Sequence, residues 1–183
     1  MEKETLKNIF DFLEEKENKK HKDNRSLKWK LFFNKSITKE ELNVNGDLNL
    51  RGLKIKSLPE GLKVGGELDL YCSRELTSLP KTLKVEGDLN LGTCTSLTSL
   101  PKGFKVGGRL NLSHCENFTS LPERLEVGGS LWLIETWGLK SLPKGLYVGG
   151  SLHIHRSNFT NFSDDEIRDM IKPGFIEGKI YRL

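Results

Sequence analysis

The stretch VEGDLNLGTCTSLTSLPKGFK, residues 85–105, decides the fold because the chain repeats it. The next 21 residues, VGGRLNLSHCENFTSLPERLE at 106–126, keep the same marker positions. Ser-Leu-Pro returns every 21 residues between Ser57 and Pro143, and a Val-x-Gly signal returns in steps of 20 or 21 from Val44 to Val148. Repeats of this length are typical of solenoids, in which each copy forms one coil that stacks on the next.

A Leu-x-Leu pair follows each Val-x-Gly signal and predicts a short strand. Alternate residues of a strand point to opposite faces, so both leucines should face the core. The second glycine of each signal, such as Gly87, is expected to allow either a positive φ or a close backbone approach. We therefore expect six strands in one parallel sheet, with the inward pairs Leu48/Leu50, Leu68/Leu70, Leu89/Leu91, Leu110/Leu112, Leu131/Leu133 and Leu152/Ile154.

The Ser-Leu-Pro side of each coil should be extended without joining a sheet, because proline cannot donate a ladder hydrogen bond. One repeat offers too few apolar residues to offset the entropy lost when 21 residues become ordered, so the coils must stack to be stable. Small polar residues recur three positions after the second leucine and should form a buried ladder. They are Ser73, Cys94, Cys115, Thr136 and Ser157.

The motif LNLGTCTSLTSLP, residues 89–101, resembles the bacterial leucine-rich repeat in its short Leu-Pro form. The similarity covers residues 42 to about 162, and extends to the repeat domains of bacterial effectors and to repeat proteins of phages. It implies a solenoid with a parallel sheet on the concave face and extended segments on the convex side. Here Cys, Ser or Thr stands where many families place a ladder Asn.

The two ends are expected to cover the exposed faces of a solenoid with helical caps. Residues 1–41 form a charged N-terminal extension, with helical spacing over 2–17 and a capping-box pattern from Thr38 to Glu41. Residues 163–183 form a C-terminal cap, in which Ser163 opens a helix followed by one or two short strands or an extended tail. Residues 42–162 are the solenoid itself.

Three columns of residues should face outward around the leucines. The acidic and polar residues fall in the first strands and the aromatic residues in the last two. Trp132 is unexpected, because the two preceding repeats carry Asn at its position. We take the outward face as the candidate partner-binding site, with Glu67, Asp69, Tyr71, Arg109, Asn111, Trp132, Ile134, Trp137, His153 and His155.

Two interpretations of Trp132 and Ile134 remain open. Exposed aromatic and aliphatic side chains in one patch tend to mark a binding surface. Alternatively, the C-terminal residues fold over the face and turn both side chains into core. His153 and His155 share a face, but a metal site would need a third ligand. The lysines at 54, 63, 81, 84, 102, 105, 140 and 144 are expected to be solvated, in turns and on the convex side.

These patterns favour a non-enzymatic protein-binding module. The resemblance narrows this to a phage or bacterial protein acting on a host protein, such as an inhibitor of an RNA-guided defence complex. The alternative is nucleic-acid binding through KENKKHKDNRSLKWK at 16–30, although residues 41–183 are nearly neutral, with 18 basic and 17 acidic side chains. Self-association through the open sheet edge at Leu48 is a further alternative.

Other classes of function lack support in the sequence. We find no catalytic motif, no zinc spacing and no phosphate-binding loop, so no enzyme activity, metal or cofactor is expected. No run of 18 apolar residues predicts a membrane span. Three cysteines and the absence of a signal-peptide pattern at the N-terminus indicate reduced thiols in a cytoplasmic compartment.

Overall fold

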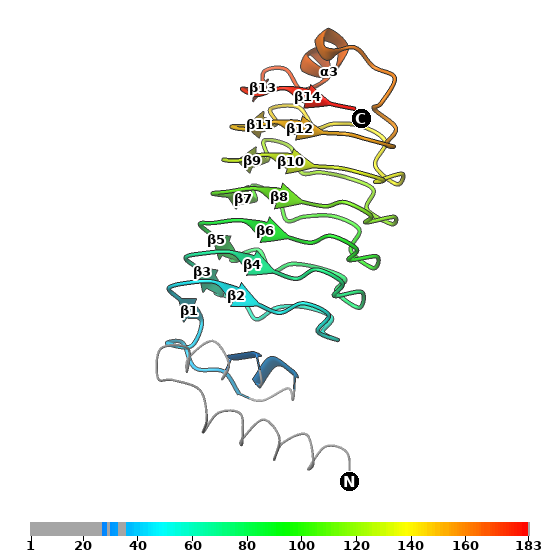
Figure 1. Cartoon of the computed structure of the whole chain (residues 1–183). Helices are drawn as coiled ribbons and strands as arrows, with labels where there is room; N and C mark the ends of the chain where they lie inside the picture. Colours follow the sequence, from blue (N-terminus) through cyan, green and yellow to red (C-terminus); the bar gives the residue numbers. More distant parts are fainter. Residues whose placement is uncertain (1–26, 29, 33–35, 183) are drawn as a thin grey trace.

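The computed structural model describes residues 27–28, 30–32 and 36–182, and these form a parallel β-solenoid. The coils stack one above another, and each contributes one two-residue strand to each of two sheets (Figure 1). The expectation of a single sheet was therefore wrong. The Val-x-Gly signals form a second sheet, whose strands are too short and too close to glycine to be recognised from the alternation of residues.

Sheet A is built from the Val-x-Gly signals and contains seven parallel strands. In each strand the second residue is buried against the core, and in most strands the first residue is exposed. The strands are β1 (Asn43–Val44), β3 (Lys63–Val64), β5 (Lys84–Val85), β7 (Lys105–Val106), β9 (Glu126–Val127), β11 (Tyr147–Val148) and β13 (Phe175–Ile176).

Sheet B is built from the Leu-x-Leu pairs and also contains seven parallel strands. The first leucine of each pair aligns with the first leucine of the next coil, as the repeat predicts. The strands are β2 (Leu48–Asn49), β4 (Leu68–Asp69), β6 (Leu89–Asn90), β8 (Leu110–Asn111), β10 (Leu131–Trp132), β12 (Leu152–His153) and β14 (Ile180–Tyr181).

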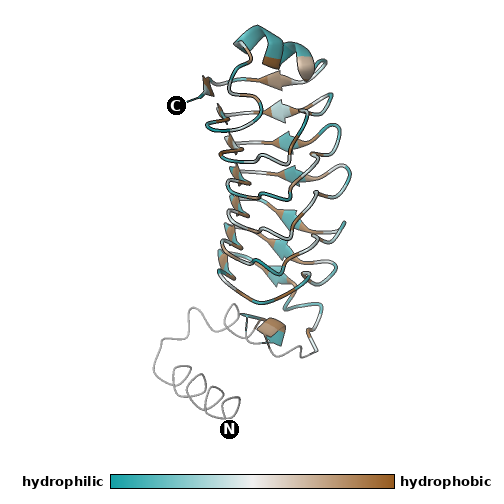
Figure 2. Ribbon diagram, turned by 90° about the vertical axis from the view of Figure 1, so that its right-hand side faces the viewer, coloured by the Kyte–Doolittle hydropathy of each residue, from teal (hydrophilic) through white to brown (hydrophobic). Residues whose placement is uncertain are grey.

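Each coil surrounds a core of apolar side chains. Hydrophobic residues recur along the ribbon from one coil to the next (Figure 2). In the repeat that opens at Val85, the predicted inward residues are all buried, from Leu89 and Leu91 to Phe104. On the Ser-Leu-Pro side the chain is extended and contributes no named strand. Outside the named strands, the only isolated bridge among the described residues joins Ser99 to Ser120. The interior of the coils and their extended side thus follow the sequence pattern.

The second glycine of each signal is required by the close approach of neighbouring coils. A Cβ atom on Gly87 would lie 2.6 Å from the carbonyl carbon and oxygen of Gly66. The positive φ angles occur elsewhere, for example at Gly103 with a φ of 69°. Of the two roles that the sequence left open for this glycine, the structure shows the close approach.

The small residues that follow the strands of sheet B form the predicted buried ladder. Ser73 Oγ donates to the carbonyl of Leu50 in the previous coil, and the thiols of Cys94 and Cys115 bond in the same way to Leu70 and Leu91. Thr136 and Ser157 instead donate to a carbonyl of their own coil. Two of the three cysteines therefore have a structural role.

At the N-terminal end, Leu27 is fully buried in the core. Thr38 and Glu41 make both hydrogen bonds of the expected capping box, although the segment forms a turn rather than a helix. The helix expected over 2–17 lies outside the described residues, as does most of the basic segment 16–30.

At the C-terminal end, helix α3 (Asp164–Met170) begins at the capping box of Ser163 and Glu166. It buries Ile167, and Ile171 follows it as the C-terminal cap residue. The chain then returns to the stack, where β13 pairs with β11 and β14 pairs with β12 (Figure 1). The sheets thus continue through residues 175–181, beyond position 162 where the sequence pattern was expected to stop.

Candidate functional site: the outward face of sheet B

The outward side chains of sheet B stand in one row, with one residue per coil. The register of the strands aligns the residue that stands between the two leucines of each pair with the equivalent residue of the next coil. The structure adds Tyr181, which pairs with His153 at the end of the row. The complete row is Asn49, Asp69, Asn90, Asn111, Trp132, His153 and Tyr181.

The aromatic end of this row is a continuous stack that begins with a cation. The guanidinium carbon of Arg109 lies 5.0 Å from the ring centre of Trp132. The rings of Trp132 and His153 are 5.1 Å apart and tilted, and those of His153 and Tyr181 are 4.7 Å apart and nearly parallel. We call these four side chains the aromatic stack. Cation–π and ring–ring contacts of this kind hold them in one arrangement.

The surroundings of Trp132 and Ile134 show whether the C-terminal residues cover these two side chains. Trp132 and Ile134 are half-buried, and Tyr181 is exposed. Strand β14 joins the edge of sheet B instead of crossing its face, and helix α3 lies at the end of the stack of coils (Figure 1). Residues 163–182 therefore lie beside and beyond the coil of Trp132 rather than across its outward face, and the ring contacts of Trp132 are with Arg109 and His153.

The two histidines of the face differ in their surroundings. Burial, and to a lesser degree the charge of Arg109, lower the pKa of His153, so its imidazole is neutral near pH 7. The Nδ1 atom of His155 lies 3.0 Å from the carbonyl oxygen of Arg182, and a carbonyl can only accept a hydrogen bond. In the neutral form, His155 therefore carries its proton on Nδ1. The backbone contact to the last coil thus fixes the orientation of this ring.

The middle of the row is a ladder of amides. Asn111 Nδ2 donates to Asn90 Oδ1 at 3.0 Å, and Asn111 Oδ1 accepts from the backbone N–H of Ser113. Asn90 accepts in the same way from the N–H of Gly92. These bonds fix the amide orientations and leave a flat polar strip between the aromatic stack and the first strands.

The first strands carry most of the negative charge of the face. Asp69 is nearly buried and forms an ion pair with Arg51 at 3.1 Å. Arg51 also lies over the ring of Tyr71, 4.5 Å from its centre. These contacts hold Asp69 and Tyr71 in place at the start of the predicted face.

Three acids stand in the column beside the row and precede strands β2, β4 and β6. We call Asp47, Glu67 and Asp88 the acidic row. Burial, and then the charges of Asp69, Asp88 and Asp47, raise the pKa of Glu67. Asp88 accepts a hydrogen bond from the backbone N–H of Arg109 and lies 3.6 Å from its guanidinium. The acidic row therefore ends at the cation that begins the aromatic stack.

Trp137, the remaining residue of the predicted site, lies on the turn beyond sheet B and is 50% exposed. Its backbone carbonyl accepts from the side chains of Lys140 and Asn158. It does not belong to the aromatic stack. The predicted set thus divides into the outward face of sheet B and one exposed residue on the adjoining turn.

The turn beyond sheet B has a feature that the sequence did not indicate. Residues that are not glycine adopt positive φ angles at the same position in successive coils, including His114, Glu135 and Arg156. Glu135 accepts from Arg156 at 3.1 Å and lies 3.2 Å from Nδ1 of His114. The hydrogen bond from Arg156, with a smaller contribution from the charge of His114, lowers the pKa of Glu135. Residue type gives no signal for this geometry.

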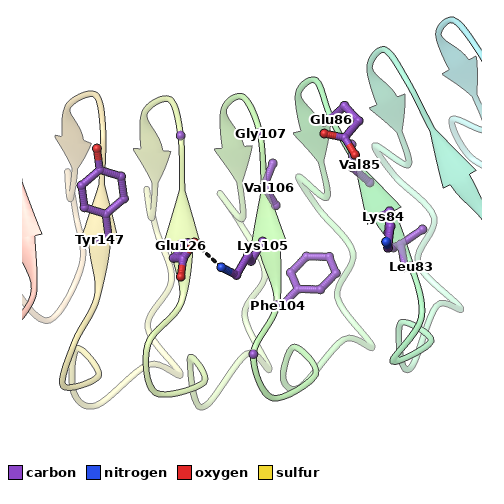
Figure 3. A pocket seen from close by; sticks show the side chains of 12 residues that line it. Leu83, Lys84, Val85, Glu86, Phe104, Lys105, Val106, Gly107, Glu126 and Tyr147 are labelled. Atoms are coloured by element: carbon purple, nitrogen blue, oxygen red, sulfur yellow. Dashed lines mark ion pairs between the residues drawn. The ribbon is translucent and has the colours of Figure 1, made fainter.

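Sheet A presents a different outward face (Figure 3). Lys63, Lys84 and Lys105, which we call the lysine row, lie on consecutive strands rather than in turns, and all three are exposed. Lys105 forms an ion pair with Glu126 at 2.6 Å. An open groove of about 530 Å³ runs over this face past Tyr147. The other predicted surface lysines are exposed outside the strands, Lys81, Lys102 and Lys144 in turns and Lys54 and Lys140 in the irregular segments between elements.

Three features of the described residues bear on metal binding, thiol reactivity and membrane crossing. No group of three or more His, Cys, Asp or Glu side chains within them is placed to hold a metal ion. Burial raises the pKa of both Cys94 and Cys115 to about 12, so neither thiol is an activated nucleophile. Of the helices in this part of the chain, none combines the length and hydropathy that a membrane crossing requires.

Comparisons with protein-family models, with curated proteins and with solved structures give no match to this chain.

Proposed function

We propose that this chain is a non-enzymatic protein-binding module that uses the outward face of sheet B. We also propose that its solenoid is a leucine-rich repeat of the Leu-Pro class. The 21-residue spacing of Leu-x-Leu and Ser-Leu-Pro and the inward leucines of sheet B support this assignment.

The aromatic stack is the observation that carries the proposal. The repeat carries Asn at this position in three of the four earlier coils and replaces it with Trp132, His153 and Tyr181 in the last three. These rings lie on an outward sheet face, where they add nothing to the core of the solenoid. Large aromatic side chains beside an arginine are typical of the energetically important residues of protein interfaces.

The arrangement of the face is suited to a partner with a defined orientation. Contacts among neighbours hold the aromatic side chains in place, so little side-chain entropy is lost when a partner binds. The acidic row at the other end adds charge that can orient the partner during its approach. The resemblance of the repeats makes a host protein, such as a subunit of a bacterial defence complex, the first class of partner to test.

The experiment is a tagged pull-down from bacterial lysate, followed by titration of the purified prey. Trp132→Ala is compared with wild type, and Trp137→Ala removes the same residue type from the adjoining turn. We expect Trp132→Ala to weaken prey binding at least tenfold while Trp137→Ala changes it little. Thermal melting of each variant separates loss of the contact from loss of the fold. Equal binding by folded Trp132→Ala and wild type would overturn the proposal.

The alternative of nucleic-acid binding through residues 16–30 remains a prediction, because most of that segment lies outside the described residues.

A further inference from the structure

The lysine row and the acidic row have the same spacing. Each contributes one residue per coil over three consecutive coils, and neighbouring coils are hydrogen-bonded in both sheets. The distance between successive charges is therefore the rise of the solenoid, about 4.8 Å for parallel strands. When two such rows are placed side by side, each charge of one row can therefore lie opposite a charge of the other along their whole length.

The rows match when one face is displaced by one coil. Lys63 belongs to the second coil and Asp47 to the first, and the same offset relates Lys84 to Glu67 and Lys105 to Asp88. Lys63 and Lys84 have no ion-pair partner among the described residues, and Glu67 lies among like charges. Each row therefore has unbalanced charge of the sign that the other could neutralise.

The same one-coil offset also matches the charges beyond the rows. The lysine row is followed on sheet A by Glu126, and the acidic row is followed on sheet B by Arg109. Lys105 and Glu126 form an ion pair within sheet A, and Asp88 and Arg109 form one within sheet B. At the offset position the two pairs face each other with opposite polarity, so each charge meets the opposite charge.

Aromatic residues complete the match. After Glu126, the outward positions of sheet A are Tyr147 and Phe175, which are aligned on adjacent strands and are 37% and 55% exposed. With the offset kept, they meet the coils that carry Trp132 and His153. The order of side chains on sheet A is thus three cations, one anion and two aromatic rings. The order on sheet B is three anions, one cation and then, in the adjoining row, the rings of Trp132 and His153.

We propose that the outward face of sheet B binds the outward face of sheet A of a second copy of this chain, with the copies parallel and offset by one coil. This inference rests on the proposed function of the sheet B face and names a partner for it. A ligand for this face must carry charges and rings at the rise of the solenoid, and the chain's own sheet A carries them in the required order. Because the two surfaces differ, the contact is heterologous and leaves one free face of each kind, so assemblies can grow beyond dimers.

The C-terminal end of the solenoid favours association of copies through their sheet faces over end-to-end association. In the coil before the last, the carbonyls of Val148 and Gly150 accept backbone hydrogen bonds from the coil that follows. In the last coil, Arg168 donates to the equivalent carbonyls of Ile176 and Gly178. A second copy therefore cannot extend sheet A at this end without displacing Arg168.

The test is sedimentation velocity of the full chain over a range of concentrations, at about 0.05 M and about 0.5 M salt, where screening differs strongly. We expect species larger than dimers at low salt and monomers at high salt. Lys84→Glu and Glu67→Lys reverse one charge on each face, at positions that oppose each other in the proposed contact. Lys54→Glu makes the same charge change at an exposed position outside both sheets and should behave as wild type.

A charge exchange between the two variants makes the test specific. Each variant alone should sediment as a monomer where the wild type assembles, because its altered face repels the unaltered one. An equimolar mixture should assemble again, because the reversed charges of the two variants then face each other. Circular dichroism melts confirm that both variants are folded.

Three outcomes would overturn the inference. A wild type that remains monomeric throughout excludes a second copy, and if Trp132→Ala still loses its prey, the proposed function survives alone. Assembly that persists in both charge variants places the contact on another surface. A monomeric wild type that binds a single-stranded oligodeoxynucleotide, with binding lost in Lys84→Glu but kept in Glu67→Lys, assigns the lysine row to a polyanion instead.

Discussion

Arg168 of helix α3 donates a 2.7 Å hydrogen bond to the backbone carbonyl of Ile176, in the last strand of sheet A. A second bond from the same guanidinium reaches Gly178 at 3.3 Å. Arg182, in turn, donates to the carbonyl of Ile180 in sheet B at 3.4 Å. Arginine side chains thus take the place that a further coil would occupy, and they satisfy carbonyl groups that would otherwise form an open edge.

The first prediction concerns this closure. Arg168→Ala should lower the free energy of unfolding by about 1.5–3 kcal/mol, the range for hydrogen bonds to charged groups. Urea unfolding measures it. Lys172→Ala removes a cation close to the same helix. Its ion-pair partner, Asp169, is exposed, so this variant should lose much less stability than Arg168→Ala. Similar losses in the two variants would show that Arg168 acts through its charge and not through the carbonyl groups.

The second prediction tests the close approach of neighbouring coils. Gly87→Ala should destabilise the solenoid by about 1–3 kcal/mol, because its Cβ would overlap the backbone of Gly66. Gly46 occupies the same repeat position in the first coil, where a Cβ would meet nothing within 4 Å. Gly46→Ala should therefore be tolerated. Equal unfolding midpoints for the two variants would contradict the role assigned to this glycine.

The third prediction follows from the lowered pKa of Glu135. A carboxyl whose pKa is depressed in the folded state contributes stability above its unfolded pKa, and this contribution is lost as pH falls through the folded value. Glu135→Gln should therefore be less stable than wild type at neutral pH, and the difference should shrink as pH falls to about 3. Melting curves across this range measure the difference.

The control for Glu135 is Glu116→Gln. Glu116 is exposed and has no ion pair among the described residues, so its variant should follow the wild-type pH profile. A difference for Glu135→Gln that stays constant with pH would show that the hydrogen bond to Arg156 matters but the charge does not.

The fourth prediction concerns the cysteines. Cys94 and Cys115 are fully buried with raised pKa values, whereas Cys72 is half-buried and accepts a hydrogen bond from Thr93. A maleimide or disulfide reagent should label Cys72 in the folded protein and all three thiols after unfolding. Peptide mass spectrometry identifies the labelled positions. Rapid native labelling of Cys94 would show that the ladder opens far more readily than its burial implies.

The sequence predicted the parts of the fold in which one side-chain requirement recurs in every coil. Leu89 and Leu110 occupy equal positions, and a register that aligns them also aligns their outward neighbours Asn90 and Asn111. For the same reason Cys94 and Cys115 could be assigned to a buried ladder. Repetition thus supplied the long-range pairing that a single strand pattern cannot give.

Sheet A and the last coil could not be predicted in this way. A strand such as Lys84–Val85 has only two residues, too few for alternation to stand out. The last coil breaks the period, because 28 positions separate Leu152 from Ile180 where the repeat requires 21. The intervening chain includes helix α3. Because this insertion breaks the period, IEGKIY, residues 176–181, was not recognised as a degenerate copy of VEGDLN, residues 85–90. Tyr181 was therefore missing from the predicted site.

The strict pairing of each coil with its neighbours has a consequence for how the outward face of sheet B changes when a repeat is gained or lost. Residues 106–126 form one complete period, and Val127 would follow Lys105 at the position that Val106 now holds. Duplicating this unit would move the acidic row away from Trp132 by one strand spacing and keep both groups intact, whereas deleting it would bring them closer and remove Arg109 from the aromatic stack. If the outward face of sheet B binds a partner as proposed, the number of repeats, more than any individual residue, sets the length of the partner surface that this face can contact.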